Sequence, residues 1–300
     1  MAAHLPKTMN QLKTILLLGA LSALLVGIGG AIGGTALHVF LAIAIVMNLV
    51  SYFFSDRIVL RMSGAKVLDE HEAPALHAMV GELAARAGIP KPRVAIVPDQ
   101  TPNAFATGRN PANALVAVTE GLLRMCDGRE LRGVIAHELA HVRNRDTLVA
   151  TIAAAGATAI SYFANAIQWA AIFGTSQQSD EDGEGGGAGG GLLMAFLAPI
   201  AATMLQMGIS RSREYLADEW AARLTQDPEG LARALQKLQR TGEMMVQNGA
   251  PAPAPATASL AIVNPLTGMG LFRLFATHPP IEDRVARLLA MARDMGVRVA

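Results

Sequence analysis

The sequence predicts a mainly α-helical protein with a small β-sheet, joined to about four membrane-spanning helices. Two observations lead to this fold class: several uncharged blocks are long enough to cross a bilayer, and the polar segments between them contain helix signals and two short strands. The composition agrees, because 52% of the 300 residues are hydrophobic and only 16% are charged, whereas an ordinary soluble domain is about a quarter charged. The net charge of +1 gives no indication of a nucleic-acid surface, and the single cysteine, Cys126, excludes an internal disulfide.

The N-terminal segment, residues 1–56, is predicted to form two membrane-spanning helices. The 42 residues from Thr14 to Ser55 contain no Asp, Glu, Lys or Arg, and one helix needs only about half that length to cross a bilayer. Glycines at 29, 30, 33 and 34 divide the stretch, which predicts spans near 14–32 and 36–54. A cleaved signal peptide fits less well, because the apolar stretch is too long and has no convincing cleavage site.

Residues 147–209 are predicted to form two further spans, near 147–173 and 191–209, around an acidic, glycine-rich loop at 175–190. A buried soluble hairpin is the alternative. Lys and Arg lie near the outer ends of all four blocks and are absent from the loop. The positive-inside rule therefore predicts that both termini and both polar segments face the cytoplasm. Arg211 and Arg213 are expected to anchor the fourth span at the interface.

The polar segments 57–146 and 210–300 are predicted to be the two parts of one catalytic domain. In the first part we expect a helix over 69–88 capped by Asp69, an extended segment at 102–108, and a helix from about 128. Strands are expected at 93–97 and 113–118. In the second part we expect helices at 209–225, 228–248 and 280–296, with a Pro-Ala linker at 249–255.

The segment His137-Glu138-Leu139-Ala140-His141 indicates a metal site. Residues four apart share a helical face, so His137 and His141 can present two imidazoles to one ion. Glu138 is then placed to act as general base on a water molecule. The alternative is that the two histidines only pack in an interface between helices. The predicted helix favours the metal site.

A catalytic zinc ion has three protein ligands and an open position. Glu214 is the best candidate for the third ligand, and Asp218, four residues later on the same face, can accept a hydrogen bond from a ligand imidazole. Spacing alone leaves this pair open, because exposed helices often carry acidic residues four apart. An even number of spans between His141 and Glu214 allows the two segments to meet on one side of the membrane.

These features together resemble the HtpX-type bacterial membrane zinc metallopeptidases, a family related to the CAAX prenyl proteases. The resemblance covers nearly the whole chain and implies a zincin-like catalytic domain with Glu214 as third ligand of one Zn²⁺ ion per chain. The matching motifs are the paired N-terminal spans, Pro102 to Gly108, His137 to His141, Asp146, Ser210 to Asp218 and Thr277-His278-Pro279-Pro280.

Several further residues can each be interpreted in two ways. Asn103, Ala104 and Phe105 are expected either to bind an extended substrate by strand addition or to form a polar turn. His278 is a candidate for stabilising the oxyanion, or it caps the last helix. Asp146 is expected either to orient a histidine or to cap the third span.

The resulting hypothesis is a zinc-dependent integral-membrane endopeptidase of the bacterial inner membrane, with a cytoplasmic site. The resemblance implies degradation of misfolded or damaged membrane proteins under stress. Expected partners are such substrates, the lipid bilayer and other membrane proteases, and no nucleic acid. The alternatives are a narrow processing protease for a membrane or lipidated peptide, a chaperone or scaffold with structural zinc, and a metal transporter. Glu138 argues against structural zinc, and spans almost free of ligands argue against transport.

Overall fold

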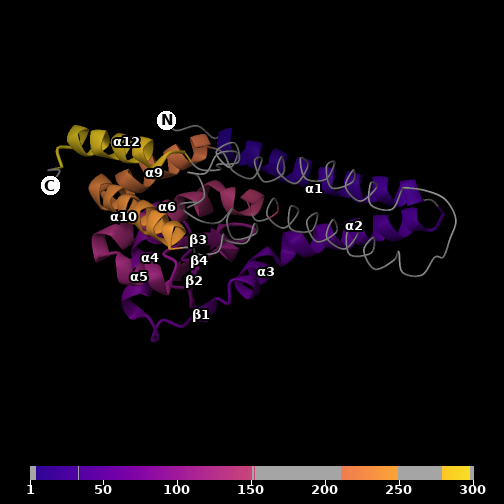
Figure 1. Ribbon diagram of the computed structural model, residues 1–300, viewed down its shortest axis with the longest axis horizontal. Helices are drawn as coiled ribbons and strands as arrows, with labels where there is room; N and C mark the ends of the chain where they lie inside the picture. The colour runs from indigo at the N-terminus through magenta and orange to yellow at the C-terminus, as the bar shows by residue number, and fades with distance from the viewer. Residues whose placement is uncertain (1–4, 33, 151, 153–210, 249–278, 298–300) are drawn as a thin grey trace.

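The computed structural model describes residues 5–32, 34–150, 152, 211–248 and 279–297 (Figure 1). The hydrophobic blocks beyond residue 152, the acidic loop, the Pro-Ala linker and His278 therefore lie outside the described residues. The helices are α1 (Leu5–Ile32), α2 (Ala36–Phe53), α3 (Ser55–Met62), α4 (Pro74–Ala87), α5 (Glu120–Met125), α6 (Gly128–Asn144), α9 (Arg211–Thr225), α10 (Pro228–Gln247) and α12 (Ile281–Asp294). The strands are β1 (Lys66–Leu68), β2 (Arg93–Val97), β3 (Ala104–Thr107) and β4 (Leu115–Thr119), with a 3₁₀ turn at Pro111–Asn113.

The expectation of a mainly helical chain with a small sheet is confirmed, but one helix start was wrong. The helix expected from Asp69 begins instead at Pro74, with Ala73 as the N-terminal cap. Proline is well suited to the first helical position because its fixed φ and missing N–H cost nothing there. The residues before it, Lys66–Leu68, pair with β2 as an additional strand. The short helices α3 and α5 were not anticipated either.

The four strands form one mixed sheet in the order β1-β2-β4-β3. Strand β2 is parallel to β4, while β1 and β3 are antiparallel to their neighbours. One face of the sheet contributes Val94, Ala106 and Val116 to the main core with the helices. The other face contributes a second cluster that includes Phe105 and is covered by Val59 of α3. The edge strand β3 is thus held between α3 and the helical layer.

Helix α6 lies at the centre of the helical layer, in contact with β3, α4, α9 and α10 (Figure 1). Its residues from Gly133 to Ala140 are all buried. The main core joins residues from 76 to 142 with residues from 221 to 288. The two polar segments of the sequence therefore share one hydrophobic core.

Helices α1 and α2 form a hairpin that extends away from this core (Figure 1). Leu17, Leu21 and Ala44 pack inside it, and Asn48 donates a hydrogen bond of 2.7 Å to the hydroxyl of Ser22. Much of its outer surface is hydrophobic and exposed. Among the described residues, no helix taken singly is long and apolar enough for a membrane span, whereas Leu37–Phe53 with Asp56–Met62 qualifies as a pair bent by 82°.

Candidate metal centre

Helix α6 is defined at both ends by local hydrogen bonds. At its start, the Asp127 carboxylate accepts from the backbone N–H of Glu130, and the Glu130 carboxylate accepts from that of Asp127, at 2.9 Å each. This reciprocal capping box satisfies two backbone donors that the helix leaves free. At its end, Arg145 adopts the left-handed conformation, with φ of 60°. The turn at Arg145 brings Asp146 back beside the last turn of the helix.

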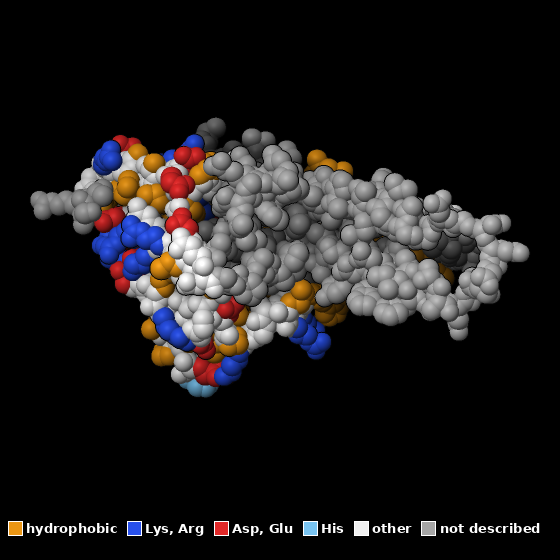
Figure 2. Space-filling model, viewed as in Figure 1, with side chains coloured by type: hydrophobic (Ala, Val, Ile, Leu, Met, Phe, Trp, Pro, Cys, Tyr) orange, Lys and Arg blue, Asp and Glu red, His pale blue; other side chains and the backbone are white. Residues whose placement is uncertain are grey.

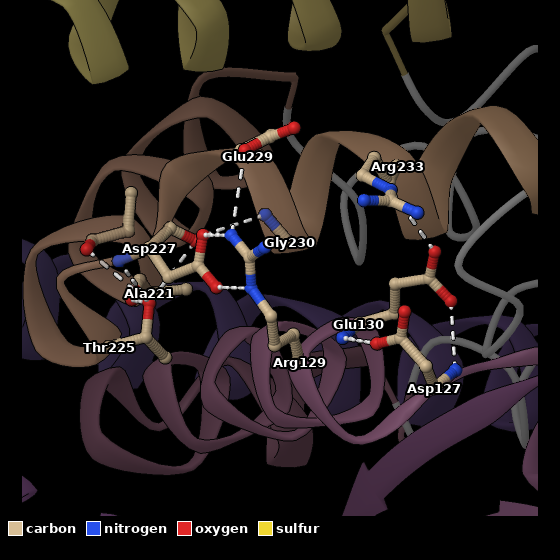
Figure 3. A network of polar contacts seen from close by, with 10 residues as sticks. Asp127, Arg129, Glu130, Ala221, Thr225, Asp227, Glu229, Gly230 and Arg233 are labelled. Atoms are coloured by element: carbon tan, nitrogen blue, oxygen red, sulfur yellow. Dashed lines mark hydrogen bonds and ion pairs between the residues drawn. The ribbon is translucent and has the colours of Figure 1, made fainter. Parts of the chain in front are cut away.

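A network of ion pairs fixes the first turns of α6 against α10 (Figure 3). Arg129 donates two hydrogen bonds of 2.8 Å to the carboxylate of Asp227. The fully buried Glu130 carboxylate lies 2.7 Å from Nζ of Lys237. One turn further along α6, Gly133 has no room for a Cβ, which would lie 2.9 Å from the backbone of Leu231. The two helices therefore cross at close range just before the metal motif.

Three side chains converge at this motif from two helices. His137 Nε2 lies 3.2 Å from His141 Nε2, and the carboxylate of Glu214 on α9 lies 3.4 Å from the first nitrogen and 3.5 Å from the second. His137 and Glu214 are buried, whereas the His141 side chain is 15% exposed. His141 is thus the most exposed of the three side chains.

The spacing of these three side chains, measured from the two Nε2 atoms to the nearer Glu214 oxygen of each, suits a single zinc ion. Ligands about 2.0–2.1 Å from zinc in tetrahedral geometry stand roughly 3.3 Å apart. The observed separations of 3.2, 3.4 and 3.5 Å match that spacing. A donor set of two imidazoles and one carboxylate is one that catalytic zinc sites use.

Each ligand imidazole has a carboxylate beside its other nitrogen. His137 Nδ1 lies 3.0 Å from Asp218, and His141 Nδ1 lies 3.1 Å from Asp146. A carboxylate at Nδ1 holds the proton there and leaves Nε2 free to bind a metal. The positions expected for Asp218 and for the histidine-orienting interpretation of Asp146 are therefore found.

Two arginines complete the centre, and the sequence reasoning missed both roles. Arg284 of α12 is fully buried and donates two hydrogen bonds of 2.7 Å to the Asp218 carboxylate. Its Nη1 lies 3.7 Å from Glu214. Arg213, expected as an interfacial anchor, instead lies largely buried with Nη1 3.2 Å from Asp146. The contact with Asp146 places the Arg213 side chain at the candidate centre.

The charges of the centre favour a divalent cation. Among the described residues, four carboxylates (Glu138, Asp146, Glu214 and Asp218) face the guanidiniums of Arg213 and Arg284, and Lys13 also interacts with Asp146, so negative charge is in excess. Without a metal ion this excess is met by protons. Burial lowers the pKa of His137, but hydrogen bonds to Asp218 and Glu214 outweigh it and raise that pKa to about 9. The His141 pKa is also raised, because Glu214 and Asp146 outweigh the effect of burial.

Glu138 lies between the metal ligands and the edge strand. Burial raises the pKa of its carboxyl, and a hydrogen bond from the backbone of Ala106 partly offsets the shift. The opposite edge of β3 pairs with β4, where Asn103 accepts from the N–H of Thr119. Because bonding direction alternates along an antiparallel strand, Ala104 and Ala106 turn their backbone groups away from β4. Asn103, Ala104 and Phe105 thus lie on or beside an edge strand next to Glu138.

Comparison with known proteins identifies relatives of this chain. The family model described as Peptidase family M48 matches residues 70–292. A protein named Protease HtpX homolog from Syntrophobacter fumaroxidans is 51% identical over 94% of this chain and 99% of its own length. Proteins with the same name from Pelotomaculum thermopropionicum and Pyrococcus furiosus are 53% and 51% identical, each over 95% of this chain and over 100% and 97% of their own lengths. Among solved structures, S. mikatae Ste24p aligns at 18% identity and a TM-score of 0.49, over 94% of this chain and 65% of that one.

Proposed function

The chain belongs to peptidase family M48, as a metalloprotease similar to HtpX, and we propose that it is a zinc-dependent membrane endopeptidase. His137, His141 and Glu214 hold the ion, and Glu138 is the general base. The observation that carries this proposal is the set of donor separations, 3.2 to 3.5 Å, beside a buried Glu138. When bound, zinc supplies Lewis-acid polarisation of the attacking water and the scissile carbonyl.

The proton chemistry belongs to Glu138. Its carboxylate accepts a proton from the attacking water and then gives that proton to the leaving amine. In the metal-free protein, burial raises the pKa of Glu138, which favours proton uptake by its carboxylate. The Ala106 backbone donates a hydrogen bond to this carboxylate. That bond fixes the position of Glu138 relative to the edge strand β3.

The substrate binds as an extended strand along the edge of β3 that does not pair with β4. Among the described residues, no other strand pairs with that edge. The backbone groups of Ala104 and the carbonyl of Ala106 provide hydrogen bonds that do not depend on the substrate sequence. This mode suits an enzyme that degrades many unfolded chains. His278 remains a candidate for stabilising the oxyanion, since it lies outside the described residues.

The α1–α2 hairpin anchors the catalytic domain in the bacterial inner membrane, with the site on the cytoplasmic side. Its exposed leucines, isoleucines and valines suit a lipid environment. Lys13 near the start of α1 interacts electrostatically with Asp146, and α2 runs into α3. Both ends of the hairpin thus lie at the level of the catalytic domain, made of segments 57–146 and 210–300. Two further spans within 147–209 remain a prediction.

The physiological role we propose is degradation of misfolded or damaged membrane proteins. The direct test of the chemistry is zinc content and casein cleavage for three proteins: the wild type, Glu138→Gln and Glu214→Ala. Glu138→Gln is expected to keep one zinc per chain and lose cleavage, whereas Glu214→Ala loses zinc as well. Full cleavage by Glu138→Gln would refute the mechanism. Cleavage of one lipidated peptide, with several unfolded membrane proteins left intact, would favour the narrow processing role instead.

A further inference from the structure

Helix α3 lies across the end of the hairpin instead of continuing it. The chain bends by 82° between Leu37–Phe53 and Asp56–Met62. Val59 of α3 packs into the cluster on the outer face of the sheet. The Asp56 carboxylate accepts a hydrogen bond of 2.5 Å from Arg93 on β2. These contacts fix which face of α3 is turned outward.

The outward face carries arginines beside exposed apolar side chains. Arg57 and Arg61 are exposed and four residues apart, so they share one side of the helix. The guanidinium of Arg57 lies 5.3 Å from the centre of the Phe54 ring, and that of Arg109 lies 5.7 Å from the centre of the Phe53 ring. We refer to Phe53, Phe54, Arg57, Arg61, Met62 and Arg109 together as the α3 surface.

The arginines of the α3 surface have no ion-pair partner among the described residues. Over the described ranges, no carboxylate lies within ion-pair distance of any of its three arginines. The rings of Phe53 and Phe54 are 48% and 43% exposed, and Met62 is 50% exposed. Figure 2 shows basic and hydrophobic side chains next to one another on the underside of the molecule, where Figure 1 places the junction of α2 and α3.

We propose that the α3 surface binds the headgroups of anionic phospholipids, with α3 lying in the plane of the membrane surface. The proposal rests on the membrane anchoring proposed above for the α1–α2 hairpin. Aromatic rings and arginines at the end of an apolar helix match the interface between hydrocarbon and headgroups. The planar guanidinium can bind a phosphate through two parallel hydrogen bonds. An anionic lipid surface therefore complements both the charge and the apolar side chains.

The α3 surface is also joined to the candidate metal centre. Val59 and Phe105 of the edge strand belong to the same cluster. Arg109 follows Gly108, whose carbonyl accepts a hydrogen bond of 3.0 Å from the Thr147 hydroxyl. Thr147 in turn follows Asp146, the partner of His141. Lipid bound at the α3 surface therefore holds the substrate-binding edge at the membrane surface.

The test uses the full chain, purified in detergent and placed in nanodiscs of phosphatidylcholine with phosphatidylglycerol. Native mass spectrometry counts the lipids of each kind that stay bound after release from the nanodisc. The wild type is expected to retain phosphatidylglycerol preferentially. Each arginine contributes about fivefold in affinity, so the variant with Arg57→Gln, Arg61→Gln and Arg109→Gln should lose at least tenfold of that preference.

The matched control removes the same charge elsewhere, through Arg86→Gln, Arg124→Gln and Arg240→Gln, all exposed residues outside the α3 surface. The control should keep the preference. Equal loss in the control, or full retention in the α3 variant, would overturn the proposal. So would displacement of the lipid by inorganic phosphate, which would indicate a phosphate site. Equal unfolding midpoints exclude misfolding, and zinc content measured on the same samples shows separately whether the proposed metal chemistry fails.

Discussion

Replacement of Arg284 by methionine should destabilise this protein more than most single substitutions. Methionine fills a similar volume but leaves the Asp218 carboxylate buried without its two hydrogen bonds of 2.7 Å. Breaking a buried ion pair from one side costs about 3–5 kcal/mol. For a domain of this size, 1 kcal/mol corresponds to about 2–4 °C, so the unfolding midpoint of the metal-free protein should fall by about 6–20 °C. Differential scanning fluorimetry in detergent measures the shift.

The double variant Arg284→Met with Asp218→Asn separates stability from metal binding. It removes both charges, and replacing a whole buried ion pair is often close to neutral. The unfolding midpoint should therefore return most of the way to the wild-type value. Zinc affinity should stay about 10–100-fold weaker, because His137 still lacks a carboxylate at Nδ1. Competition with a chromophoric chelator measures that affinity.

Two results would refute this account of Arg284. One is a single variant whose midpoint lies within about 2 °C of wild type, which corresponds to less than the cost of an unpaired buried charge. The other is a double variant that recovers zinc affinity together with stability. The second result would mean that Asp218 supports the fold without orienting His137.

Three further outcomes are expected. Glu138→Gln should bind zinc with wild-type affinity in calorimetry while casein cleavage falls by at least about 10²-fold; parallel loss of zinc would contradict the assigned role. Gly133→Ala should cost about 1–3 kcal/mol in thermal unfolding, because its Cβ meets the Leu231 backbone at 2.9 Å, whereas Gly128→Ala, in open space, should be neutral. Because the metal-free His137 pKa is about 9, zinc must displace a proton below that pH, so zinc affinity should weaken as the pH falls from about 9; a flat profile between about pH 7 and 9 would contradict this. The raised pKa of His137 also stabilises the metal-free fold. This contribution is complete below about pH 6.5 and is lost as the pH rises through 9.

The three residues that could hold a metal ion were singled out from sequence, the histidines by their spacing and Glu214 by the resemblance as well. His137 and His141 are four residues apart on one helix, and Glu214 and Asp218 repeat the spacing on another. Spacing alone left the assignment of Glu214 and Asp218 open, because exposed helices often carry acidic residues four apart. The shared core places α9 against α6 and so brings these two residues to the histidines. Such packing between distant segments has no signature within either segment.

Arg284 was missed although the sequence contained a signal. Its helix places Ile281, Val285 and Leu288 on one buried side, and Arg284 occupies the same side. A charged residue on an apolar helical face requires a buried partner, and Asp218 was already a candidate for that region. The predicted start of α4 was wrong for another reason. Asp69 is a residue type that often caps helices, but Pro74 and the pairing of Lys66–Leu68 with β2 decide the boundary.

The position of Arg284 along the chain has a consequence for the timing of synthesis. His137 and Glu138 leave the ribosome roughly 150 residues before Arg284 does, which is on the order of ten seconds at ordinary rates of translation. During that interval Asp218 has no guanidinium to hold it against His137. A nascent chain therefore carries the metal motif without the support that fixes it. The candidate metal centre gains that support only when the last helix docks.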